Sequence, residues 1–468
     1  MSRVRPARFV AVIDIGKTNA KLALVDLDIG SEIAVRRIAN RQLRSGPYPH
    51  ADIAGIWDFL CQSLADLNRQ TPIDAISATT HGASAALVTA TGGLALPVLD
   101  YEHRGPDDCE AEYARARPAF SQSLTPRLPG GLNLGKQLFW QARRFSAEFS
   151  RAKWILPYPQ YWGFRLSGVA ATEITSIGCH TDLWNFGADR FSDLVTAQGW
   201  QRMFAPIRPA RAVLGPIRPA LAQKLGLRAG IPVHVGIHDS NASLLPHLMA
   251  RTAPFAVVST GTWVVVCAPG GDLENLDAGR DSYANIDALG QHVPSARFMG
   301  GREFSDLIGE DGQQADLETI KRVLKYKWML LPSVSRGSGP FPTLDARMTV
   351  AREDISAQAH YAIVSIYLAM MTAQCLDLAA ASGDIIVEGP FVKNNLFLQM
   401  LRSATGRPVL AQKSSRTGTS VGAALLVADS AEKLALAATI PVADQLQSDL
   451  AAYAQEWRKT TRMEQGKF

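Results

Sequence analysis

The sequence contains little cysteine, and this scarcity limits the classes of protein that it can encode. Its 468 residues include five cysteines, far apart at positions 61, 109, 179, 267 and 375. Such spacing is neither a disulfide framework nor a zinc-ligand pattern, and it is typical of a reducing cytosol. The formal net charge of +5 is small for this length, and no run of lysines and arginines is interleaved with aromatics. We therefore expect no nucleic-acid partner.

Long hydrophobic runs are also lacking. The basic start of the chain is followed only by the short apolar run Phe9–Ile15, whereas a signal peptide needs a longer apolar region and a small-residue cleavage site. The most apolar later stretch, Phe255–Ala268, is shorter than a membrane span and contains Ser-Thr-Gly-Thr. We therefore predict a cytoplasmic protein with no membrane partner.

Three common site motifs are missing as well. Gly16-Lys17-Thr18 resembles the end of a Walker A motif, but position 11 is alanine where that motif has glycine. The segment also returns into a second strand, which predicts a hairpin, instead of opening a helix. No Gly-x-Gly-x-x-Gly sequence is present, so a dinucleotide enzyme of the usual kind has little support. No His-Glu-x-x-His sequence is present either.

The composition that is present, with 47% apolar and 19% charged residues, is typical of a globular enzyme. The length exceeds that of one hydrophobic core, so we predict two domains, residues 1–248 and 249–468. Alternating strands and helices predict an α/β fold with largely parallel pairing. We expect strands at residues 9–14, 21–26, 75–80, 233–237, 255–259, 262–266 and 384–388, and helices at 53–67, 241–249, 363–378, 395–402 and 420–428. The segment 104–151 is polar and mixed and gives no clear element.

Two aspartates stand at the ends of predicted strands. Asp14 ends the first strand just before Gly16, and Asp239 lies between a short strand and a helix. Carboxylates at such positions can hold Mg²⁺ or accept the proton of an attacking hydroxyl, as phosphoryl transfer requires. The alternatives are a solvated turn aspartate for Asp14 and a helix N-cap for Asp239.

Other polar residues suit a sugar or a nucleotide. Glu102 and Arg104 alternate along an extended segment and could bind vicinal hydroxyls, although a surface ion pair would look the same. His81 follows the third strand and could line the same pocket or be a core histidine. The turn at Gly389 permits close approach of a base or ribose, with Asn394 as a polar contact; the alternative is a simple strand–helix loop.

Five segments occur in an informative order. They are Asp14-Ile15-Gly16-Lys17-Thr18-Asn19, Gly236-Ile237-His238-Asp239, Ser259-Thr260-Gly261-Thr262, Glu388-Gly389-Pro390-Phe391-Val392-Lys393-Asn394 and Gly418-Thr419-Ser420-Val421-Gly422-Ala423-Ala424. With them the chain resembles the FGGY family of carbohydrate kinases over nearly its whole length. The resemblance implies two ribonuclease H-like, actin-like ATPase domains with a central cleft that holds ATP and sugar.

The resemblance also implies roles for single residues. Asp239 would be the catalytic base, and Asp14 and Asp239 would hold Mg²⁺. The sugar contacts would be His81, Gly82, Glu102, Arg104 and Asp239. The ATP contacts would be Lys17, Thr18, Asn19, Thr260, Gly261, Thr262, Gly389 and Asn394.

Two departures and one local likeness refine this expectation. Bulky Pro390-Phe391-Val392 follows Gly389 where the family has small residues, and Glu102 stands where several sugar kinases carry aspartate. Residues 172–176 and 179–184 look closest to the branch that phosphorylates rhamnulose or fuculose. We therefore expect ATP-dependent phosphorylation of a primary hydroxyl of a ketose or deoxyketose such as L-rhamnulose or L-fuculose. An actin- or chaperone-like ATPase switch and a catalytically weak sugar-binding regulator are the alternatives, and the sequence leaves homodimer formation open.

Overall fold

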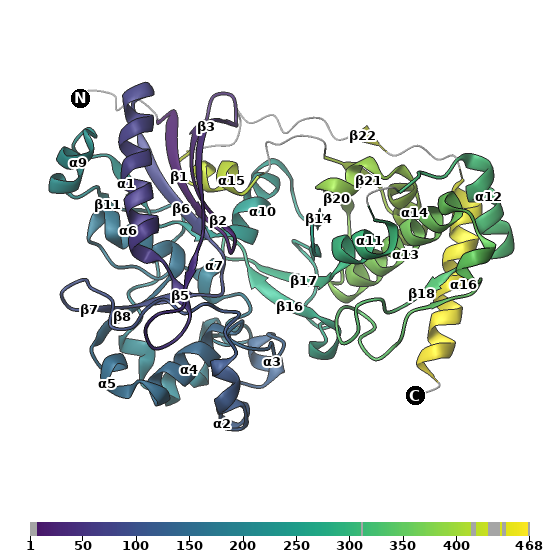
Figure 1. Cartoon of the computed structure of the whole chain (residues 1–468), viewed down its shortest axis with the longest axis horizontal. Helices are drawn as coiled ribbons and strands as arrows, with labels where there is room; N and C mark the ends of the chain where they lie inside the picture. Colours follow the sequence, from purple (N-terminus) through teal and green to yellow (C-terminus); the bar gives the residue numbers. More distant parts are fainter. Residues whose placement is uncertain (1–6, 310–311, 413–417, 429–439, 442–445, 467–468) are drawn as a thin grey trace. The chain divides into compact units, whose positions relative to one another are not determined.

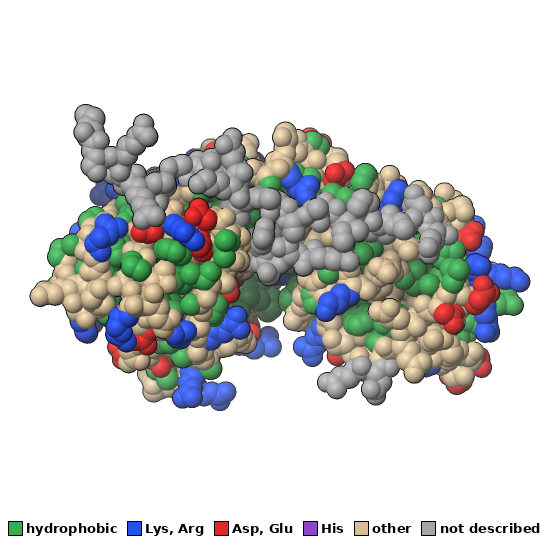
Figure 2. Space-filling view, turned by 90° about the horizontal axis from the view of Figure 1, so that it is seen from above, with side chains coloured by type: hydrophobic (Ala, Val, Ile, Leu, Met, Phe, Trp, Pro, Cys, Tyr) green, Lys and Arg blue, Asp and Glu red, His purple; other side chains and the backbone are tan. Residues whose placement is uncertain are grey.

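The computed structural model describes residues 7–309, 312–412, 418–428, 440–441 and 446–466. It divides into two compact units (Figure 1). Unit 1 comprises Met1–Arg251, Ala284–His292 and Ser415–Leu436, and unit 2 comprises Thr252–Tyr283, Val293–Ser414 and Ala437–Phe468. On the face shown in Figure 2, lysine and arginine side chains are scattered among acidic and apolar ones.

The centre of unit 1 is a mixed sheet with the strand order β11-β12-β6-β1-β2-β3, and β13 also pairs with β6. β1 and β2 form the predicted antiparallel hairpin, and β6 pairs with β1 in parallel. The predicted strand at 233–237 is divided into β12 and β13, because Gly236 between them has a φ of +87° and a Cβ there would lie 2.5 Å from the carbonyl oxygen of Ala78. The strands are β1 (Phe9–Ile15), β2 (Asn19–Asp26), β3 (Ser31–Ala39), β6 (Ala75–Thr80), β11 (Val213–Pro216), β12 (Pro232–His234) and β13 (Ile237–His238).

Helices cover both faces of this sheet. Along β1 the alternate residues Ala11, Ile13 and Ile15 pack in one core with α1, α6 and α9, whereas Val10 and Val12 pack in another with α10 and α15. α15 packs closely on α10, since a Cβ on Gly422 would lie 1.7 Å from the carbonyl oxygen of Ala242. These helices are α1 (Ile53–Gln70), α6 (Tyr158–Ser167), α9 (Pro219–Leu225), α10 (Asp239–Ala250) and α15 (Thr419–Leu425).

The segment 104–151, which gave no clear element by sequence, folds into short helices that lie in the chain between the paired antiparallel strands β7 and β8. Buried ion pairs hold this region: Lys136 is 1% exposed and bonds Asp107, and Asp182 is fully buried beside Arg117. The remaining elements of unit 1 are β4 (Gln42–Leu43), β5 (His50–Ala51), β7 (Ala85–Thr89), η1 (Gly105–Cys109), α2 (Glu110–Ala116), α3 (Phe120–Ser123), α4 (Leu134–Arg144), α5 (Ser146–Phe149), β8 (Ala152–Pro157), α7 (Ile174–Ile177), β9 (Trp184–Asn185), β10 (Arg190–Phe191), α8 (Asp193–Ala197) and η2 (Trp200–Arg202).

Unit 2 repeats the opening pattern of unit 1. β14 and β15 are antiparallel and β20 pairs with β14 in parallel, as β1, β2 and β6 do. The first strands of the two units therefore share a common arrangement. The sheet order is β16-β17-β15-β14-β20-β21-β22. Its strands are β14 (Phe255–Thr260), β15 (Val264–Cys267), β16 (Ser282–Ile286), β17 (His292–Phe298), β20 (Asp384–Glu388), β21 (Val409–Ala411) and β22 (Ile440–Pro441).

The longest helix of unit 2, α13 (Ala357–Leu378), lies in its hydrophobic core. Within the described ranges it is the single helix long and apolar enough to cross a membrane, and 89% of that apolar window is buried, as in a core helix. The other elements of unit 2 are η3 (Ala278–Arg280), α11 (Gly300–Ile308), α12 (Leu317–Tyr326), β18 (Leu330–Leu331), β19 (Arg347–Met348), η4 (Arg352–Asp354), η5 (Pro390–Lys393), α14 (Asn395–Thr405) and α16 (Gln447–Gln465).

Candidate active site

Asp239 is the first residue of α10, directly after the short strand β13, and His238 occupies the N-cap position. Its Oδ1 accepts a hydrogen bond from the N–H of Ser240 at 2.6 Å and lies 3.2 Å from Nε2 of His238. About a third of the side chain, 32%, is exposed. Burial raises the pKa of Asp239, but the hydrogen bond and charge of His238 and the nearby His81 outweigh this effect and lower the pKa to about 2. Asp239 is therefore an ionised, partly open carboxylate.

His81 lies near Asp239, and Gly82 lies against the ring of His238. A Cβ on Gly82 would lie 2.8 Å from Nε2 of His238, so only glycine lets this backbone approach the histidine ring. The His81 ring packs against Tyr101 and Tyr158 at centroid distances of 4.9 and 5.3 Å. Burial lowers the pKa of His81 to about 4, so His81 is neutral at physiological pH and offers a hydrogen bond without charge.

Lys17 joins the first hairpin turn to the predicted sugar-binding segment. Its Nζ bonds the carboxylate of Asp100, lies 3.1 Å from Oε2 of Glu102 and stands 4.7 Å from the ring centroid of Tyr101. Glu102 thus pairs with Lys17. Arg104 instead pairs with Asp107 at 3.1 Å, and 84% of its side chain is exposed. The structure does not bring Glu102 and Arg104 together as one sugar-binding pair.

The turn after β1 is held in shape by Asn40. Its Nδ2 donates to the carbonyl oxygen of Gly16 at 2.7 Å, and its N–H donates to that of Thr18 at 2.9 Å. Thr18 and Asn19 have exposed side chains, with Nδ2 of Asn19 donating to Oγ1 of Thr18. Both are therefore accessible to a phosphate.

Asp14 at the end of β1 has two partners that the sequence reading missed. Its Oδ2 lies 2.9 Å from Nζ of Lys21 and accepts a hydrogen bond from Oγ of Ser420 at 2.9 Å. Lys21 is its antiparallel neighbour on β2, and this neighbour follows from the predicted hairpin. Ser420 stands 406 positions away in sequence, and only the fold brings it to Asp14.

The candidate metal ligands, Asp14 and Asp239, are single carboxylates and not part of a cluster among the described residues. No group of three or more histidine, cysteine, aspartate or glutamate side chains gathers in the part of the chain that the structure describes. Mg²⁺ takes one or two carboxylates together with water and substrate oxygens, so Asp14 and Asp239 suit it and a closed zinc site is not formed there.

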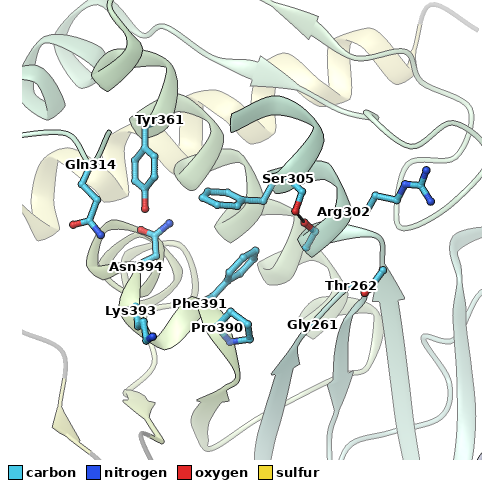
Figure 3. Close-up of a pocket in the computed structure, with 12 residues that line it drawn as sticks. Gly261, Thr262, Arg302, Ser305, Gln314, Tyr361, Pro390, Phe391, Lys393 and Asn394 are labelled. Carbon is cyan, nitrogen blue, oxygen red and sulfur yellow. Dashed lines mark hydrogen bonds between the residues drawn. The ribbon is translucent and has the colours of Figure 1, made fainter. Parts of the chain in front are cut away.

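Unit 2 contains a pocket of about 510 Å³ beside the turn between β14 and β15 (Figure 3). Gly261 and Thr262, two of the predicted ATP contacts, line it together with the start of α11 and the η5 turn. The sequence reading missed most of the lining on α11, on α13 and before α12: Gly301, Arg302, Phe304, Ser305, Gln314 and Tyr361. The paired glycines at 300–301 were the available signal, because a Cβ on Gly301 would lie 1.7 Å from the carbonyl oxygen of Gly261.

Thr260 and Gly389 give this pocket its shape. Oγ1 of buried Thr260 donates to the carbonyl oxygen of Glu388 at 2.6 Å and accepts from the N–H of Phe391 at 3.1 Å. Gly389 has a φ of +89°, and its Cβ would lie 2.0 Å from the carbonyl oxygen of Thr260. The two turns predicted to bind the nucleotide, at Thr260 and at Gly389, are therefore hydrogen-bonded and closely packed against each other.

Asn394 lines the pocket, but internal hydrogen bonds engage both ends of its amide. Oδ1 accepts from the N–H of Phe397 and so caps α14, while Nδ2 donates to Oγ of Ser365. The bulky Phe391 does not close the pocket, because it is 6% exposed and packs against Phe304 and Phe397 at ring distances of 5.6 and 5.2 Å.

Both units of the chain match models of one protein family. The N-terminal domain model of the FGGY family of carbohydrate kinases matches residues 9–246, and the C-terminal domain model of carbohydrate kinase FGGY matches residues 252–435. The chain belongs to the FGGY family of carbohydrate kinases. Its two sheet-containing units have the actin-like ATPase fold of that family.

Solved structures and curated sequences add the following likenesses. A carbohydrate kinase from Novosphingobium aromaticivorans is 31% identical with a TM-score of 0.90, covering 98% of this chain and 100% of that one. A ligand-bound xylulose kinase from Lactobacillus acidophilus is 16% identical with a TM-score of 0.78 and 98% of both chains covered, which shows the fold alone. An L-fuculokinase from Salmonella typhi is 26% identical over 273 residues, 57% of each chain. The chain thus spans little more than half the length of the curated relatives that it matches.

Proposed function

We propose that this protein transfers the γ-phosphoryl group of ATP to a primary hydroxyl of a sugar, with Asp239 as the general base. The observation that carries the proposal is the ionised, partly exposed carboxylate of Asp239 beside His81 and Gly82. Membership of a kinase family supports it. In this proposal unit 1 binds the sugar and unit 2 binds ATP, in the cytoplasm.

In the proposed reaction the sugar oxygen attacks the γ-phosphorus and its proton passes to Asp239, while ADP leaves. Phosphoryl transfer needs little covalent assistance from the protein, so positioning and charge stabilisation dominate. A bound Mg²⁺, held by Asp14 and Asp239 directly or through water, would neutralise charge on the phosphates. Thr18 and Asn19 on the first turn, and Gly261 and Thr262 on the second, are the proposed phosphate contacts, whereas Lys17, which the resemblance assigned to ATP, is proposed to face the sugar because it pairs with Glu102.

The proposed substrate class is a ketose or deoxyketose such as L-fuculose or L-rhamnulose. The L-fuculokinases among the curated relatives support this class at 26% identity. Within the site, the neutral His81 and the Lys17–Glu102 pair supply donors and an acceptor for sugar hydroxyls. These groups would form a sugar subsite. An ATPase that acts only as a switch would not need such a subsite.

The test is a coupled ADP-release assay with MgATP against a panel of ketoses, deoxyketoses, polyols and glycerol. We expect one sugar to raise ADP release, and Asp239→Asn to lower kcat by about 10²–10⁴-fold while calorimetry still detects sugar binding. Asp66→Asn, an exposed carboxylate on α1, serves as the matched control. Steady hydrolysis without sugar would favour an ATPase switch, sugar binding without turnover would favour a regulator, and full activity of Asp239→Asn would remove Asp239 from the base role.

A further inference from the structure

The short helix α7 is anchored by a buried glutamate that the proposed reaction does not use. Glu173 has no exposed surface and occupies the N-cap of α7. Its carboxylate accepts hydrogen bonds from the backbone N–H groups of Thr175 and Ser176 at 2.9 and 3.2 Å. It also accepts from their hydroxyls at 2.6 and 3.1 Å. Capping alone requires only the backbone contacts, so the hydroxyl contacts call for a separate explanation.

The hydroxyl of Thr175 links this cap to the residue before Asp239. Its Oγ1 accepts a hydrogen bond from the backbone N–H of His238 at 3.1 Å. Since a backbone N–H can only donate, the hydroxyl proton is left to point at Oε2 of Glu173. The result is a directed chain of two hydrogen bonds, from His238 through Thr175 to Glu173.

This chain of hydrogen bonds adds a second attachment for the start of α10. The first is the pairing of β13 with β6, with His238 opposite Thr80. The second is the hydrogen bond from the backbone of His238 to Thr175, and the next residue is Asp239. The His238 ring in turn lies 3.2 Å from Oδ1 of Asp239. A displaced His238 would therefore move the carboxylate directly.

We propose that Glu173 and Thr175 are positioning residues that hold Asp239, through the backbone of His238, in its reactive orientation. The inference rests on the proposed role of Asp239 as the base. Neither residue is expected to touch sugar or ATP. Their loss should therefore lower kcat and leave the KM of the sugar nearly unchanged, because a misplacement of about 1 Å can cost about 100-fold in rate.

The experiment compares three substitutions in the same buried segment. Thr175→Val removes the hydroxyl at nearly constant shape, and Thr175→Ser keeps it. Thr181→Val is the matched control, because Thr181 is also fully buried and its hydroxyl donates to the carbonyl oxygen of Ile177, without a bond to His238. We expect Thr175→Val to lower kcat by about 10–100-fold, Thr175→Ser to restore it, and Thr181→Val to preserve it at a similar loss of Tm.

A second measurement does not depend on turnover. Hydrogen exchange in the peptide containing residues 237–240 should accelerate in Thr175→Val and stay near wild type in Thr181→Val. Unchanged kcat and unchanged exchange in Thr175→Val would overturn the inference, as would an equal loss of kcat in Thr181→Val. The proposed function fails separately: in that case Asp239→Asn itself retains turnover.

Discussion

Replacing Gly301 by alanine offers a test of the nucleotide pocket in unit 2. The added Cβ would lie 1.7 Å from the carbonyl oxygen and 2.7 Å from the carbonyl carbon of Gly261. Both atoms belong to the backbone, so no rotamer change can relieve the contact. The start of α11 and the turn at Gly261 must therefore separate by about 1.5 Å or more to reach ordinary van der Waals distance.

The size of the effect follows from that separation. Forcing extra atoms into a packed contact costs about 1–3 kcal/mol. Gly261 and Gly301 both line the pocket, so the displacement falls on the surface that is proposed to hold ATP. If about 1.4 kcal/mol of this cost appears in binding, ATP affinity falls tenfold. We expect the KM of ATP to rise about tenfold or more, with sugar affinity unchanged because Gly301 lies in unit 2.

The assay titrates MgATP and sugar separately in the coupled reaction, with calorimetry for each ligand. Gly466→Ala is the control, since the nearest atoms to its Cβ stand at 3.6 and 3.9 Å. An unchanged KM for ATP in Gly301→Ala, with a Tm equal to that of the wild type, would refute the reasoning. A rise in the sugar KM alone would assign the pocket to another ligand.

Three further predictions concern unit 1. Lys17→Met should raise the KM of the sugar more than that of ATP, because Lys17 pairs with Glu102; the opposite result in steady-state kinetics would support the phosphate role. Arg117→Met should lower the free energy of unfolding in urea by about 3 kcal/mol, because it leaves the carboxylate of Asp182 buried without its cation. The exposed Arg69→Met should lose less than about 1 kcal/mol, and equal losses would contradict the reasoning. Burial raises the pKa of Glu173 from 4.5 to about 7, so the folded state binds more protons than the unfolded chain between these values, and stability is lost as pH rises through this window. Glu173→Gln should flatten the dependence of Tm on pH there, because it removes a change of about 3 kcal/mol in the free energy of unfolding across this window. An unchanged profile would show that Glu173 does not titrate in this range.

Much of the fold could be predicted because its central strands are continuous apolar runs. β6 and β20 begin and end at the predicted residues, Ala75–Thr80 and Asp384–Glu388. Strands that are buried on both faces can be predicted from their continuous apolar composition alone. The segment 104–151 could not be predicted in this way, because its short helices are held by buried ion pairs such as Lys136–Asp107, and those polar residues read as surface in the sequence.

The position of a candidate site residue could be predicted only where its side chain stands next to a strand end. Asp14, Asp239 and His81 fall in this group, since the strand direction determines where they lie. Contacts between distant segments gave no signal: Lys17 meets Asp100 across 83 positions, and Tyr361 reaches the pocket from the long core helix. Such contacts depend on the path that the loops take between the strands and helices, and no local sequence pattern predicts that path.

The glycines explain why the family could be recognised although the sugar could not. Gly236 and Gly389 each sit at a strand end with a positive φ, and in each case a Cβ would strike the carbonyl oxygen of a neighbouring strand, at 2.5 and 2.0 Å. These positions are needed by the fold whatever the substrate is, so motifs built on them identify the fold. The proposed sugar contacts Lys17 and Glu102 depend instead on a pairing of side chains, and neither Gly236 nor Gly389 indicates that pairing. Exchanging Glu102 for aspartate, one methylene shorter, should therefore change the preferred sugar in the ADP-release panel while leaving ATP affinity intact; an unchanged preference would place specificity elsewhere in unit 1.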